Sequence, residues 1–115
     1  MKLIDLAPKW AVDPDILIGD RAVHTPDRRG MGITFACPHC VAMRPNAPLE
    51  RGGVIQFLGV FFKNSIDGQP HTDDVPLTRL WLRVGTDFET LSLTPSIDAS
   101  KSGHWHGFIT NGEAR

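Results

Sequence analysis

The stretch that decides the fold is residues 32 to 40, which read Gly-Ile-Thr-Phe-Ala-Cys-Pro-His-Cys. Ile33 and Phe35 share one face of this alternating run, as in a strand with one buried side. The strand leads directly into Cys37 and Cys40, whose spacing brings two thiolates to one metal ion in zinc knuckles and ribbons. The stretch therefore predicts a core strand that ends in one half of a metal site.

Further segments have strand character, and short turns connect some of them. The strand candidates are Leu3–Leu6, Val54–Phe62, Leu80–Gly85, Phe88–Leu93 and His104–Thr110. Gly85-Thr86-Asp87 and Asn111-Gly112 predict tight hairpin turns, which imply antiparallel neighbours. Nine prolines and eleven glycines exclude a bundle of long helices. We expect a mainly β fold with minor helix, in which a small antiparallel sheet folds over itself as a sandwich or partial barrel.

Length and composition bound the class of protein. The 115 residues predict one domain, 1–115, with a modest core. A formal net charge of -1 argues against a nucleic-acid partner. Mean hydropathy is -0.14, and no stretch approaches the length of a membrane span. Asp5 interrupts any signal-like apolar start, so we expect a cytoplasmic protein whose two cysteines are thiols or metal ligands.

A second chemical pattern lies near the carboxyl end, in His104-Trp105-His106. Residues i and i+2 of a strand point to the same side. The two imidazoles would then lie side by side, with Trp105 packed into the core on the opposite face. By the same alternation, Phe108 sides with the histidines and Ile109 with the tryptophan. The pattern predicts a second pair of metal ligands.

Each half of the site has a simpler interpretation. Cys37 and Cys40 can be a redox pair, but such a pair opens a helix in a β-α-β unit, and the prolines after Met43 predict a loop. His104 and His106 can be surface residues beside a core tryptophan. Together, however, the two patterns supply the ligands of a tetrahedral Cys₂His₂ zinc site. We predict one Zn²⁺ held by Cys37, Cys40, His104 and His106, closing a loop of roughly 65 residues and stapling a small core.

Two downstream blocks resemble the small DUF6527 proteins. The blocks are residues 81–97 (WLRVGTDFETLSLTPSI) and 103–113 (GHWHGFITNGE), and the upstream strand with its Cys-Pro-x-Cys run is similar too. The resemblance implies a metal-binding β domain of a phage, a prophage or a bacterial conflict-related gene cluster. Many members of the family carry a further cysteine near the position of Ser102 or Gly103, which this chain lacks. The resemblance therefore leaves open which of His104 and His106 is the ligand.

The expected function is that of a non-enzymatic, zinc-stabilised interaction module. It would be a phage or prophage accessory protein that binds another protein, for example to inhibit a host defence system. Four protein ligands leave no open metal position, and no phosphate loop or nucleophile elbow is present. His71, Asp73 and Asp74, in a polar loop, are the expected partner-binding residues. The alternative is a zinc-dependent hydrolase with three protein ligands and a water, in which Asp73, Asp74 or Glu89 is the base.

Overall fold

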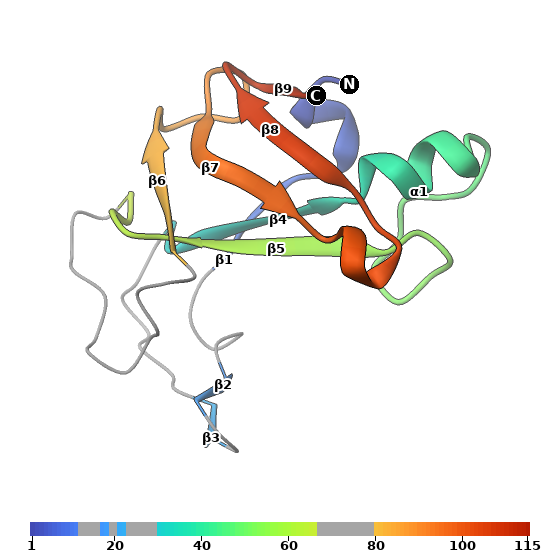
Figure 1. The fold of residues 1–115 in the computed structure, drawn as a ribbon, viewed down its shortest axis with the longest axis horizontal. Coiled ribbons are helices and arrows are strands. Elements are labelled where there is room, and N and C mark those ends of the chain that lie inside the picture. Colours follow the sequence, from blue (N-terminus) through green and yellow to red (C-terminus); the bar gives the residue numbers. More distant parts are fainter. Residues whose placement is uncertain (12–16, 19–20, 23–29, 67–79) are drawn as a thin grey trace.

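The computed structural model describes residues 1–11, 17–18, 21–22, 30–66 and 80–115 (Figure 1). The two chain ends lie together. The amino group of Met1 donates to the Ala114 carbonyl over 3.1 Å, and it lies 3.7 Å from a carboxylate oxygen of Glu113. Within the described ranges, no helix is long and apolar enough to cross a membrane.

Seven strands of the described chain form one mixed sheet, in the order β1-β4-β5-β6-β7-β8-β9. Their bounds are β1 Lys9–Ala11, β4 Gly32–Ala36, β5 Phe57–Phe62, β6 Leu80–Val84, β7 Ser92–Asp98, β8 His106–Thr110 and β9 Glu113–Ala114. Two shorter strands, β2 (Leu17–Ile18) and β3 (Arg21–Ala22), pair with each other. The helical elements are the 3-10 helices η1 (Leu3–Leu6) and η3 (Ser100–Ser102) and the α-helix α1 (Pro38–Met43). The prediction of a mainly β fold with minor helix is confirmed.

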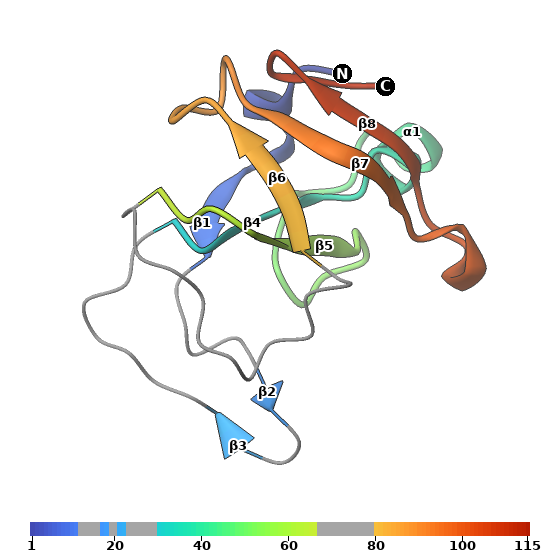
Figure 2. The same ribbon diagram turned by 60° about the vertical axis from the view of Figure 1, so that its left-hand side comes forward.

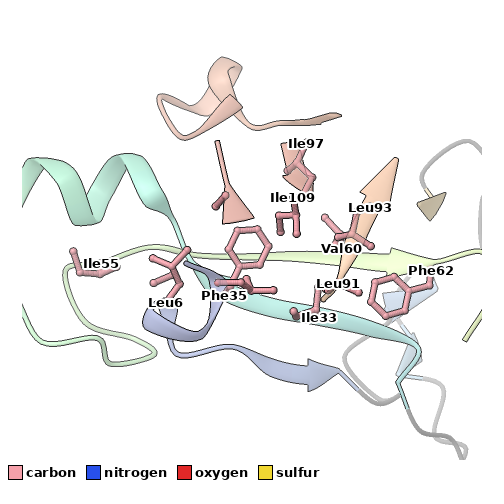
Figure 3. Close-up of a cluster of buried hydrophobic side chains, with 13 residues drawn as sticks. Leu6, Ile33, Phe35, Ile55, Val60, Phe62, Leu91, Leu93, Ile97 and Ile109 are labelled. Carbon is pink, nitrogen blue, oxygen red and sulfur yellow. The ribbon is translucent and has the colours of Figure 1, made fainter. Parts of the chain in front are cut away.

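The core lies between the two parts of the sheet. Strands β1, β4 and β5 make one part, and β6, β7 and β8 cross them at an angle (Figures 1 and 2). Figure 3 shows apolar side chains from both parts meeting between them, together with Leu6 of η1. These buried residues are Leu3, Leu6, Ile33, Phe35, Ala36, Ile55, Val60, Phe62, Leu91, Leu93, Ile97, Ile109 and Ala114. The sheet therefore folds over itself, as the sequence predicts.

The pairing of β4 with β5 follows from the alternation read in the sequence. The two strands are antiparallel, with Ile33 opposite Val60 and Phe35 opposite Leu58. Ile33 and Phe35 are fully buried, so the predicted inner face is confirmed. Strand β5 begins at Phe57 rather than Val54, because its pairing starts opposite Ala36 and the preceding residues form a turn.

The expectation of an antiparallel sheet is wrong at one pair. Strands β5 and β6 run parallel, with Phe61 opposite Leu80 and Phe62 opposite Trp81. A parallel pair needs a crossover rather than a tight turn. Residues 63–79 join the two strands, and the sequence favours a loop or an open hairpin connection for residues 64–76. The hairpin alternative is wrong, because a hairpin joins antiparallel strands.

Two other expected elements differ. Leu3–Leu6 is a 3-10 helix and not a strand, since Leu3 and Leu6 are both buried and the three-residue period of this helix puts them on one side. Strand β7 continues through Pro95, where a loop is expected. An irregularity between Leu93 and Ile97 takes the proline out of the ladder with β8, which is where a sheet tolerates it.

Of the two predicted hairpin turns, one is confirmed and one is wrong. Asn111 and Gly112 have φ angles of 48° and 74°, and they join Thr110 to its partner Glu113. The predicted Asn-Gly turn is therefore confirmed. The predicted tight turn at Gly85-Thr86-Asp87 is wrong, because β7 begins only at Ser92, after a longer connection.

Candidate metal centre

The two cysteines stand at the start of α1. Cys37 is the N-cap residue and Pro38 occupies the first turn, where its missing N–H is not needed. The Cys37 Sγ accepts a hydrogen bond from the Cys40 backbone N–H over 3.5 Å. The sequence does not predict this helix, which spans Pro38–Met43 and takes only the first residue of the loop expected from Met43 onward. The flanking strands β4 and β5 are antiparallel, so this is not the β-α-β setting of a thioredoxin-like redox pair.

The backbone of Gln56 holds the cysteine turn in place. Its carbonyl accepts from the Cys37 N–H over 2.8 Å, which extends the β4–β5 ladder by one residue. Burial raises the pKa of the Cys40 thiol, and a backbone hydrogen bond from Gln56 and the Arg44 charge act in the opposite direction. A bound cation would convert such a thiol to the thiolate. Gln56 thus fixes the cysteine turn to the end of the β4–β5 ladder.

His104 reaches the cysteines from the connection between β7 and β8. The His104 N–H donates to the Ala99 carbonyl over 3.0 Å, and the Ala99 N–H donates to the Trp105 carbonyl over 2.9 Å. Asp98 fixes the start of this turn, because one carboxylate oxygen accepts from both the N–H and the hydroxyl of Ser100, over 2.9 and 2.5 Å. These hydrogen bonds lower the pKa of Asp98.

Cys37, Cys40 and His104 form one potential ligand group. Their ligand atoms all lie within 4.8 Å of one another, and Cys40 Sγ is 3.4 Å from His104 Nδ1. Sulfur and nitrogen bound to one tetrahedral zinc ion lie about 3.5 Å apart, given metal–ligand bonds near 2.3 and 2.0 Å. Cys37 is fully buried and the other two are half-buried. The donor set and its spacing fit a transition-metal ion such as zinc.

His106 lies elsewhere. Strand β8 begins at His106, opposite Asp98, so His104 and His106 do not occupy alternating positions of one strand as expected. The His106 side chain is exposed, and the ligand group found among the described residues does not include it. Its role as a ligand stays a prediction. The register beyond it is as expected, with Phe108 exposed and Ile109 buried.

The expected partner-binding residues and the expected catalytic bases do not belong to the described ligand group. His71, Asp73 and Asp74 lie outside the described residues. Glu89 lies beside the β8–β9 hairpin, where its carbonyl is 2.3 Å from the Cβ that Gly112 would have. His104 and this hairpin stand at opposite ends of β8, so Glu89 is distant from the ligand group.

Sequence reasoning missed two supporting residues. Gln56 acts through its backbone, which no residue-type pattern reveals. Asp98 had a readable signal, because Asp-x-Ser is a common local hydrogen-bonded turn.

Comparison with known proteins adds no relative. No family model, no curated protein and no solved structure matches this chain. The fold and the site together define a mainly β domain with a Cys₂His group that can bind a metal ion. The DUF6527 resemblance stays a prediction from the sequence.

Proposed function

We propose that this domain is a non-enzymatic interaction module stapled by zinc. The observation that supports it is the origin of the ligands. Cys37 and Cys40 follow β4, in one part of the folded sheet, whereas His104 follows β7, in the other. Both segments lie at the same end of the molecule (Figures 1 and 2). A metal ion there would tie the two parts together beside the core.

The energetic consequence is large for a chain of this size. Cys40 and His104 are 64 residues apart in sequence. By the chain-entropy relation used for disulfides, closing such a loop restricts the unfolded state by about 4 kcal/mol. A small domain typically has only about 5–15 kcal/mol of total stability. A structural role for the metal is therefore sufficient to explain the site.

The partner is proposed to be another protein. The near-zero net charge of -1 supports this over a nucleic acid. The phage or prophage origin, the inhibition of a host defence system and the cytoplasmic location rest on the sequence expectations alone. His71, Asp73 and Asp74 are the proposed contact residues, and replacing all three with alanine should weaken partner binding without changing zinc content or melting temperature.

Metal analysis tests the structural role. Protein purified without added metal should contain close to one zinc per chain, and a chelator should lower its melting temperature substantially. An apo protein as stable as the zinc-loaded protein, or a Cys37–Cys40 disulfide without metal in a reduced preparation, would contradict the proposal.

A zinc-dependent hydrolase is the second candidate, and the three-residue ligand group favours it. Catalytic zinc commonly has three protein ligands and an open position. Of the bases considered, Glu89 is distant from the group, which leaves Asp73 and Asp74. Esterase, peptidase or phosphodiesterase turnover that disappears in Asp73→Ala, in a folded and zinc-loaded protein, would favour this function over the first.

A further inference from the structure

The ligand group has three members among the described residues, whereas a tetrahedral ion takes four donors. The group also has an accessible side. Cys37 is buried, but Cys40 and His104 are half-buried. Next to His104, Gly103 is exposed, and a Cβ added to it would meet nothing within 4 Å. The side of the group that bears Cys40 and His104 is therefore partly open to solvent.

We propose that the fourth position of this metal accepts a thiolate from another molecule, which makes the site a docking point for an external cysteine or small thiol. This inference rests on the proposed function, since it requires the bound metal.

The charge of the site bears on which donor it takes. A divalent ion with two thiolates and one neutral imidazole has no net charge, so an added thiolate leaves one negative charge. Arg44 lies four residues after Cys40, and its N–H donates to the Cys40 carbonyl over 2.9 Å. Arg44 is the C-cap residue of α1, one turn after Cys40. The backbone thus holds a cationic residue next to the turn that carries Cys40.

Ligand chemistry favours sulfur among anions. Soft thiolates select zinc, and three cysteines with one histidine form a standard structural set. In the exchange, the incoming thiol forms a metal–sulfur bond, solvent leaves the metal, and the thiol proton passes to bulk water. No oxidation state changes, so the reaction needs no oxidant or reductant.

Cobalt(II), a coloured substitute for zinc, provides the test. The cobalt-loaded protein is titrated with 2-mercaptoethanol, with ethylene glycol as the control that lacks sulfur. Thiolate-to-cobalt absorbance should rise about 1.5-fold at saturation, because two thiolates become three, while bound cobalt after gel filtration is unchanged. Ethylene glycol should change nothing. Failure to take up cobalt would count against the proposed function, whereas uptake without a thiol response would overturn only this inference.

Substitutions test whether a protein side chain fills the fourth metal position and whether the Arg44 charge assists thiol binding. His106→Ala should keep both the cobalt spectrum and the thiol response. A changed spectrum in His106→Ala, or in His24→Ala, His71→Ala, Asp73→Ala or Asp74→Ala, would show a fourth protein ligand and overturn the inference. Arg44→Gln should weaken thiol binding several-fold, with Lys63→Gln as the matched loss of charge. Equal thiol binding in both would overturn the choice of an anionic donor.

The source of the thiolate is resolved in the same assay. Glutathione stands for a small thiol, and a short peptide with one cysteine stands for a protein partner. Tighter binding of the peptide would identify the position as part of a protein interface, and tighter binding of glutathione would identify a small-thiol site. Absence of a response to both would overturn the inference.

Discussion

The rings of Phe35 and Trp105 meet edge to face, with centroids 6.1 Å apart and planes at 88°. Phe35 lies two residues before Cys37, and Trp105 directly follows His104. The same aromatic contact thus joins the backbone segments that carry the ligands from both parts of the sheet. Core packing and metal-site geometry are coupled at this point.

Truncating Trp105 should therefore weaken both the packing of the core and the binding of zinc. Its side chain packs partly buried against the core, so Trp105→Ala should lower the free energy of unfolding by about 3 kcal/mol. Zinc affinity should fall as well, because His104 loses its neighbouring anchor. Phe108→Ala, on the strand that follows Trp105, is the control: Phe108 is 50% exposed, and the change should stay within about 0.5 kcal/mol. Denaturant unfolding and zinc titration measure the two quantities, and equal effects of the two substitutions would refute the described register.

Replacing a residue of the ligand group should lower zinc content and melting temperature, whereas replacing the neighbouring His39 should not. Cys40→Ser and His104→Ala should each reduce bound zinc and melting temperature, since each removes a donor from the group. His39 lies between the cysteines with an exposed side chain, so His39→Ala should leave both quantities unchanged. Elemental analysis and thermal unfolding of the three variants provide the comparison. A loss of zinc in His39→Ala would mean that the ligand set is different.

The Asp98 turn should respond to acid in a defined direction. Hydrogen bonds from Ser100 lower the pKa of Asp98 in the folded protein. Its contribution to stability is therefore present above the pKa of the unfolded carboxyl, about 3.9, and is lost as pH falls through the lower folded value. An NMR titration should show the Asp98 pKa below that of an ordinary aspartate and restored upward in Ser100→Ala. An unchanged value in this variant would refute the hydrogen-bonded turn.

Gly112 should tolerate a side chain worse than Gly52. Both have positive φ angles, 74° and 83°, so alanine at either position should cost about 1 kcal/mol. A Cβ at Gly112 would also lie 2.3 Å from the Glu89 carbonyl, whereas at Gly52 nothing lies within 4 Å. Gly112→Ala should therefore destabilise by a further 1–3 kcal/mol, roughly the cost of overpacking. Equal losses in urea unfolding would contradict the packing of this hairpin.

Local backbone geometry explains what the sequence alone determined. Alternation at Ile33 and Phe35 identifies a strand and its buried face, because side chains of a strand point to opposite sides in turn. The Asn111-Gly112 pair identifies a hairpin, because few residues accept two successive positive φ angles. Cys37 and Cys40 identify two members of the potential ligand group, because their spacing alone brings two sulfurs together. Each of these inferences needs only a few consecutive residues.

Long-range packing decided the rest. The parallel pairing of β5 with β6 depends on how the chain returns after Phe62, and no neighbouring residue records that path. Leu3–Leu6 forms a 3-10 helix because the core accepts both leucines on one side, which depends on the packing of this segment beside β4. Either of His104 and His106 fits the local pattern. Only the turn from Ala99 to Trp105 brings one of them within 3.4 Å of a cysteine 64 residues earlier, because that distance depends on how the two parts of the sheet pack.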